Sequence, residues 1–272
     1  MDNSTLVREN SSLIPTITEC HANRLGWPRT LLGGFSMYLS IPFWVICHVT
    51  LATFCYQWIM RPILGIKRLR WADYVILDRH RIDGLVAIDK FNCLFCGYAN
   101  GITTLINHEL DQLNQLEKQT SMMKRIAGTV AAILFLPFIV IGDIFCVRFN
   151  YDMIIAPLLG MHTTSFAEIQ LQLHANQWGK NFNPLAKYLF VYAKNVFTRV
   201  ALLLEQIESS WCPLYHLENR TDVVYPEHHQ HFFKADELDK MRQVLSSKGS
   251  VSPRQPENVK PFAKPTGWLF WD

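Results

Sequence analysis

Two long stretches of the chain consist almost entirely of apolar residues. The first runs from about residue 34 to 60 and the second from about 126 to 147. Each contains the roughly 20 apolar residues that a helix needs to cross the hydrocarbon core of a bilayer. The chain is only 18% charged, against about 25% in soluble domains. We therefore predict an integral membrane protein rather than a soluble protein that buries both stretches as core helices.

Each apolar segment carries a proline near its middle, Pro42 in the first and Pro137 in the second. Proline removes a backbone donor and bends a helix, and membrane helices tolerate it better than soluble ones do. Two interpretations follow: a kinked helix that crosses the membrane, or a re-entrant hairpin that returns to the side from which it entered. The predicted fold class is an all-α integral membrane protein with two apolar transmembrane or re-entrant segments plus amphipathic interfacial helices.

The remaining sequence divides into four parts around these segments. Residues 1–33 form a polar N-terminal segment whose acidic residues do not fit the basic start of a signal peptide. Residues 61–125 form a cationic loop with a C-x-x-C pair and an amphipathic helix. Residues 148–217 form a helical region that ends in W-C-P-L-Y-H, and 218–272 a polar and partly disordered tail. The tail ends in an aromatic run, residues 267–271, which would rest on the membrane or dock on a membrane protein partner.

Residues 185–209 predict an amphipathic helix, because their apolar side chains recur at three- and four-residue steps. These side chains are Leu189, Tyr192, Val196, Val200, Leu203 and Ile207. Such a helix lies in the membrane interface or packs on the other helices.

Basic residues gather between the two apolar segments. They are Arg61, Lys67, Arg68, Arg70, Arg79, Arg81, Lys118, Lys124 and Arg125. The positive-inside rule then places loop 61–125 in the cytoplasm, where these side chains would also meet lipid headgroups. The net charge of +3 is too small and too dispersed to indicate a nucleic-acid partner, so the expected partner is the lipid bilayer.

Three of the seven cysteines form a pattern typical of metal sites. Cys93 and Cys96 make a C-x-x-C pair, whose thiolates can hold one ion from a tight turn, and Cys212 precedes His216 by four positions. Together they make a Cys3His set that suits zinc, and iron is the alternative because soft thiolates bind both. Two other interpretations remain open: a redox dithiol at Cys93 and Cys96, or unrelated buried cysteines.

The shared metal site meets a topological objection. One apolar segment separates Cys96 from Cys212, and a single crossing would put the two on opposite faces of the membrane. The site therefore requires either that segment 126–147 re-enters at Pro137 or that residues 153–167 return part of the way.

Each of the other polar clusters has a structural interpretation as well as a chemical one. Residues 78–81 with Asp83 combine acids and a histidine that would transfer protons, or they form a salt-bridged turn. His108 is either an extra metal ligand or part of a solvated helix face. Residues 228–231 include three histidines, which either chelate a metal ion or lie on the surface. No nucleotide-binding or acyl-transfer motif is present in the sequence.

Residues 75–81, 89–101 and 211–216 resemble a family of uncharacterised bacterial membrane proteins with N-C-x-x-C-x-Y-x-N-G and W-C-P-x-x-H motifs. The resemblance covers about 60 residues by these fairly specific motifs. It implies a bacterial inner (plasma) membrane location and a grouping of Cys93, Cys96, Cys212 and His216, but no known reaction. This chain departs from the family by placing a second apolar segment between the two motifs.

The expected function is that of an integral membrane protein whose Cys3His zinc site has a structural or assembly role. The alternative is a membrane-bound redox enzyme that uses an iron centre or the C-x-x-C dithiol.

Overall fold

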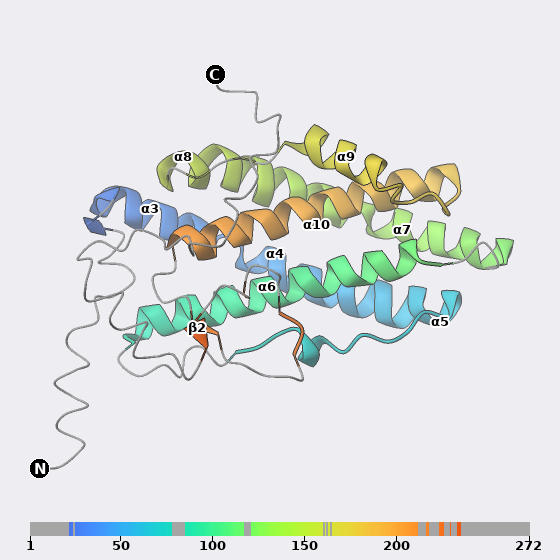
Figure 1. Ribbon diagram of the computed structural model, residues 1–272, viewed down its shortest axis with the longest axis horizontal. Helices are drawn as coiled ribbons and strands as arrows, with labels where there is room; N and C mark the ends of the chain where they lie inside the picture. The colour runs from blue at the N-terminus through green and yellow to red at the C-terminus, as the bar shows by residue number, and fades with distance from the viewer. Residues whose placement is uncertain are drawn as a thin grey trace, which may run out of the picture.

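The two apolar segments form two long helices (Figure 1). The first is built from α3 (Trp27–Tyr38), α4 (Ile41–Ile46), the π-helix η1 (Cys47–Met60) and α5 (Arg61–Leu64). The second is built from α7 (Met122–Gly142), the π-helix η4 (Asp143–Ile155) and α8 (Ala156–Leu159). We call them the first and second apolar helix. Each is 38 residues long and apolar enough to cross a membrane by length and composition.

The computed structural model describes residues 22–23, 25–77, 85–116, 121–159, 161, 163, 165–211, 216–217, 223–225, 229 and 233–234. Within these residues the fold is helical apart from one parallel pair of two-residue strands, β1 (His216–Leu217) and β2 (Phe233–Lys234). The predicted all-helical class with two long apolar helices is therefore confirmed. Both helices extend beyond the predicted segments 34–60 and 126–147.

Neither proline reverses the chain. Pro42 lies in the first turn of α4, where its missing N–H costs little. Pro137 lies inside α7, and the helix continues past it to Leu159. A re-entrant hairpin at Pro137 is therefore not what the chain forms.

Two further long helices, α6 (Ala87–Asn114) and α10 (Pro184–Trp211), pack against each other and complete a bundle of four (Figure 1). α6 also packs on the first apolar helix and α10 on the second. Asn183 begins α10 by accepting a hydrogen bond from the Ala186 amide, and Pro184 follows it at a position that tolerates proline.

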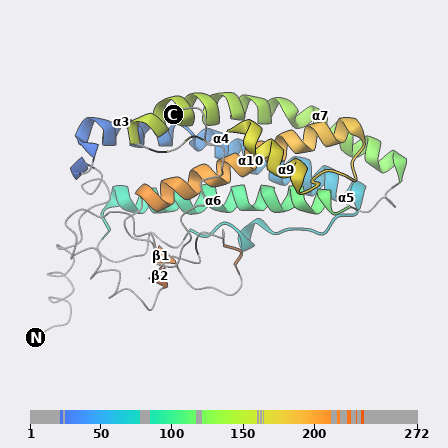
Figure 2. The same cartoon turned by 45° about the horizontal axis from the view of Figure 1, so that its top comes forward.

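A strap of residues 66–77, which includes the short 3-10 helix η2 (Trp71–Asp73), runs back along α6 (Figure 2). Gly65 ends α5 in the left-handed conformation, with φ 72°, and turns the chain into the strap. Gly97 and Gly101 let the strap approach α6. A Cβ at Gly101 would lie 2.6 Å from the carbonyl oxygen of Tyr74, so a larger residue does not fit there.

The bundle has two ends, which we name by what they carry. α5 and the start of α7 meet at one end, and the Arg125 guanidinium there donates to the Asn181 carbonyl over 2.7 Å. We call this the cationic end. At the other end, α3 packs against α8. The start of α6, with Cys93 and Cys96, lies there too, because the Tyr38 hydroxyl of α3 donates to Asn92. We call this the cysteine end.

Candidate functional site

The two apolar helices expose apolar side chains along one side of the bundle. This apolar face includes Leu31, Leu32, Phe35, Leu39, Val45, Ile46, Val49, Phe54, Trp58, Ile126, Val130, Ile133, Leu134, Phe138, Ile141, Ile144 and Phe145. No charged side chain is exposed between Arg29 and Arg61 on the first helix, or between Lys124 and Arg148 on the second. Only 33% of the most apolar stretch of each helix is buried, so neither is enclosed by the rest of the described chain.

The side of the bundle formed by α6 and α10 is covered by polar elements. The strap lies over α6, and α9 (Phe166–Ala175) packs on α10. The strap and the region of α9 expose the polar side chains of Lys67, Arg68, Arg70, Gln172, His174 and Gln177. The molecule therefore has one apolar side and a second side, here called the polar side, where exposed polar residues lie beside the exposed Trp71 and Leu171.

Polar side chains on the first apolar helix find partners on α6. Their hydrogen bonds join Tyr38 to Asn92, His48 to Tyr98 (3.0 Å), Tyr56 to Gln112 (2.8 Å) and Gln57 to Glu109 (3.1 Å). Buried polar groups are costly unless they are hydrogen-bonded, so α6 completes a helix that would otherwise carry unsatisfied groups. Burial raises the pKa of Glu109 well above its usual range, although the hydrogen bond from Gln57 opposes this shift.

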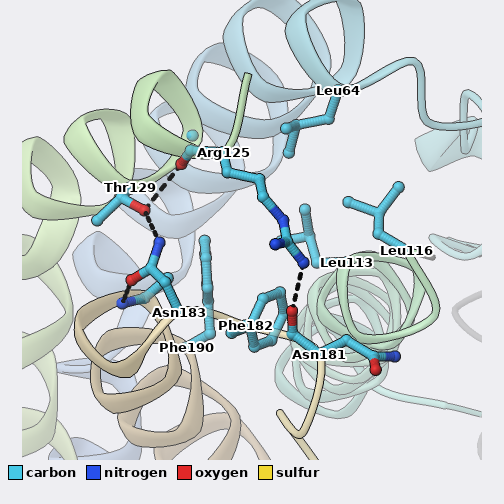
Figure 3. Close-up of a pocket in the computed structure, with 11 residues that line it drawn as sticks. Leu64, Leu113, Leu116, Arg125, Thr129, Asn181, Phe182, Asn183 and Phe190 are labelled. Atoms are coloured by element: carbon cyan, nitrogen blue, oxygen red, sulfur yellow. Dashed lines mark hydrogen bonds between the residues drawn. The ribbon is translucent and has the colours of Figure 1, made fainter. Parts of the chain in front are cut away.

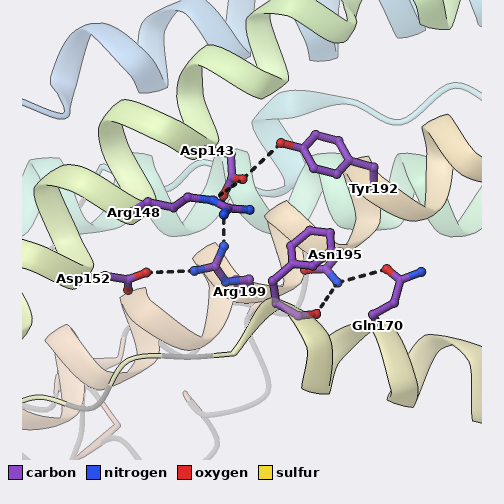
Figure 4. Close-up of polar contacts among 8 residues, drawn as sticks. Asp143, Arg148, Asp152, Gln170, Tyr192, Asn195 and Arg199 are labelled. Carbon is purple, nitrogen blue, oxygen red and sulfur yellow. Dashed lines mark hydrogen bonds and ion pairs between the residues drawn. The ribbon is translucent and has the colours of Figure 1, made fainter. Parts of the chain in front are cut away.

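The densest charged cluster joins the second apolar helix to α10 (Figure 4). Arg199 of α10 donates to Asp143 over 3.0 Å and to Asp152 over 2.9 Å, and Asp143 also accepts from Arg148 over 2.8 Å. The hydroxyl of Tyr192 donates to Asp143 over 3.0 Å. This arrangement fixes the rotation of α10 against η4, because both acids on η4 point to the same guanidinium.

Sequence reasoning did not identify this cluster. Asp143 was visible as the one acid in the second apolar segment, and an ionisable residue in such a segment usually has a partner. Its main partner, Arg199, lies 56 positions later on the inner face of α10. The signal available in the sequence was Arg199 itself, because it is a charged residue at a position where the helical period of α10 predicts burial.

The structure places Cys93 and Cys96 inside α6 rather than in a tight turn. Cys93 is buried and Cys96 is half-buried. No glycine or proline interrupts the chain between Ala87 and Cys96, so the helix forms and puts both thiols on one face a turn apart. Cys212 lies outside the described residues, and only the backbone of His216 is described.

The packing of α10 on α6 bears on the topological objection. Lys194 forms an ion pair with Asp111 at 2.9 Å, and the Asn107 side chain donates to the Phe197 carbonyl over 3.0 Å. The two helices are therefore antiparallel, and α10 runs toward the end of α6 that carries Cys93. The chain returns to the cationic end over residues 161–183, so Trp211 and Cys93 belong to the same end of the bundle.

Other predicted residues have separate surroundings. The His108 ring lies 3.1 Å from the Tyr74 hydroxyl, and burial lowers its pKa. His229 is buried and hydrogen-bonds Glu208 of α10 over 2.6 Å. Residues 78–83 lie outside the described part of the chain. Among the described residues, no group of three His, Cys, Asp or Glu side chains is arranged to hold a metal ion.

Comparisons with known proteins found no matching family model, no matching curated protein and no matching solved structure. The apolar face, the buried Asp143–Arg199 cluster and the cysteine end are therefore interpreted from their own chemistry.

Proposed function

We propose that this protein lies along the plane of a bacterial inner membrane, with its apolar face in the lipid and its polar side in the cytoplasm. The apolar face carries the proposal, because water contact with so many large apolar side chains is unfavourable by about 25 cal/mol for each Å². The cations of loop 61–125 would stay on the cytoplasmic side, as the positive-inside rule expects.

The length of the apolar helices favours this orientation over a perpendicular one. The 24 or more residues of each apolar helix that lie outside its π-helical part alone span about 36 Å at 1.5 Å per residue. The hydrocarbon core of a bilayer is about 30 Å thick. A helix that lies along the membrane needs no such match.

The polar side of the bundle also favours the in-plane orientation. α6 and α10 run beside the apolar helices, and they carry the strap and α9 with them. A perpendicular bundle would place the polar side chains of Gln172 and His174 at the depth of the lipid tails together with Arg70, and a charged side chain costs about 2.5–3.5 kcal/mol or more there. In the in-plane orientation these side chains stay in water.

We also propose that Cys93, Cys96, Cys212 and His216 hold one structural zinc ion at the cysteine end. Two thiols on one face of α6, and an antiparallel α10 that ends one residue before Cys212, support this proposal. A Cys3His zinc site is closed and redox-silent. Its role would be to fasten the end of α10 to α6, which the in-plane orientation allows because both lie on one side of the membrane.

Metal analysis of the protein purified in neutral detergent tests the zinc site. We expect about one zinc per chain in the wild type, and loss of most of it in Cys93→Ser and Cys212→Ser. Cys55→Ser on the first apolar helix is the matched control and should keep its metal. Full metal in both variants, or none in the wild type, would show that the proposal is wrong. Visible absorbance that bleaches on reduction would show that the site holds iron rather than zinc.

A further inference from the structure

A pocket opens at the cationic end of the bundle, between the ends of α5 and α6 and the starts of α7 and α10 (Figure 3). Its walls are mostly apolar, with Leu64, Leu113, Phe182 and Phe190, and include a few polar side chains. Among the described residues that line it, Arg125 is the one that carries a charge. An apolar site with one well-placed cation is typical of sites that bind a ligand with an apolar body and an anionic group.

A second cavity shares Leu113 and Phe190 with this pocket and is lined by side chains from all four long helices. Among the described residues, its lining is apolar except at a few positions, of which Glu109 is the charged one. Burial raises the pKa of the Glu109 carboxyl well above its usual range, which favours its uncharged form.

The guanidinium of Arg125 has donors left for an anion. One of its N–H groups donates to the Asn181 carbonyl over 2.7 Å. This is the one hydrogen bond that the guanidinium makes with the described residues. A guanidinium carries five donors in a planar fork that matches phosphate and carboxylate oxygens.

The position of the pocket brings it next to the lipid. Met122, Met123 and Ile126 are exposed beside Arg125 at the start of α7, and Ile126 begins the apolar face. This step rests on the proposed function, because it assumes that the apolar face lies in a bilayer.

We propose that this pocket binds one anionic lipid, with the phosphate or carboxylate group at Arg125, the first carbons of one acyl chain against Leu64 and Phe182, and the rest of the chain along the apolar face from Ile126. The shared chemistry of the ligand is an anionic head on an unbranched hydrocarbon chain. A phospholipid of the surrounding leaflet and a free fatty acid both have it.

Native mass spectrometry of the detergent-purified protein tests this site, with one compound added at a time. We expect one tightly retained molecule per chain of palmitoyl-oleoyl phosphatidylglycerol or of palmitate, and which of the two is retained identifies the source. The matched phosphatidylcholine should be retained at least several-fold less. Equal retention of phosphatidylcholine, or retention of inorganic phosphate alone, would overturn the proposal.

Two variants locate the site. Arg125→Gln should reduce the retained phosphatidylglycerol or palmitate about tenfold, whereas Lys124→Gln removes the same charge from an exposed neighbour and should leave it unchanged. Ala186→Met fills the pocket wall with Arg125 intact and should also reduce retention. Circular dichroism melting curves verify that each variant folds. Equal losses in Arg125→Gln and Lys124→Gln would mean general charge attraction and would contradict a built site.

This test is separable from that of the proposed function. If the protein fractionates with membranes but retains no anionic lipid, only the lipid site is wrong. If the protein does not associate with membranes at all, the proposed function is wrong whatever adducts form in detergent.

Discussion

The guanidinium of Arg199 lies 3.0 Å from the carboxylate of Asp143, and the two side chains are exposed by only 3% and 1%. This ion pair joins α10 to the π-helical part of the second apolar helix. Asp152 shares the guanidinium, so each charge has an opposite charge within hydrogen-bond distance. The buried acid of the apolar helix is therefore paired both with Arg148 of its own helix and with Arg199 of α10.

Replacing Asp143 by alanine should lower the free energy of unfolding by about 3–5 kcal/mol, because it leaves Arg199 with an uncompensated part of its buried charge. Arg148→Ala is the matched control. The Arg148 side chain is 52% exposed, and its loss should cost about 0–1 kcal/mol. Unfolding in a titration with dodecyl sulfate measures both. Equal effects of the two substitutions would contradict the structural role of the buried pair.

The strap should be displaced by one added methyl group on α6. In Gly101→Ala the new Cβ would lie 2.6 Å from the Tyr74 carbonyl oxygen and 2.7 Å from the Val75 Cα, which are backbone atoms that cannot rotate away. We expect a loss of about 1–3 kcal/mol and faster proteolysis within residues 66–77.

Gly34→Ala is the control for this substitution, since nothing lies within 4 Å of its added Cβ and it also sits inside a helix. Alanine should there stabilise the protein by about 0.5–1 kcal/mol through its better helix propensity. Unchanged proteolysis of the strap in Gly101→Ala would show that the strap does not pack on α6 as described.

Glu109 should make stability depend on pH. Burial raises the pKa of its carboxyl, so the folded protein holds a proton that the unfolded chain has released above the ordinary glutamate pKa. Stability is then greatest below that ordinary pKa and falls as the pH rises toward the folded pKa. Glu109→Gln should remove this fall and stabilise the protein at alkaline pH by about 1–3 kcal/mol.

Thermal melting of the wild type and Glu109→Gln in detergent from pH 5 to pH 9 measures the effect. The control is Gln112→Glu, which adds a carboxyl at a half-buried position on the same helix. If the melting temperatures of the wild type and of Glu109→Gln changed in parallel across this range, a buried, protonated Glu109 would be ruled out.

The apolar helices were predictable because a long apolar run needs no knowledge of its partners. The ends of these helices were not predictable. The second apolar helix continues past Arg148 and Asp152, and these charges are tolerated because Arg199 and Asp143 pair with them. Contacts between residues so far apart in sequence leave no local pattern.

The same limit applies to the cysteine end. The C-x-x-C pair was visible and suggested a tight turn, whereas α6 begins at Ala87 and holds both cysteines within the helix. The return of the chain over residues 161–183 could be stated only as a requirement, because that stretch is short and lacks a strong apolar period. The antiparallel register of α10 on α6 depends on Lys194 and Asp111, which are 83 positions apart.

The orientation of the apolar face is tested most directly by spin-label depth measurements in lipid vesicles. Labels are attached through a genetically encoded ketone amino acid at Ile126, Leu134 and Phe145 in turn, which leaves the native cysteines intact. These positions lie on the exposed face of the second apolar helix and span about 28 Å of its axis. Relaxation by oxygen, compared with relaxation by a water-soluble nickel chelate, reports the depth of each label. The in-plane account predicts equal, lipid-buried depths at all three positions and a water-exposed label at Gln172 of α9. A deep label at Leu134 between two shallow ones would indicate a perpendicular crossing, and water exposure of all four labels would contradict membrane embedding altogether.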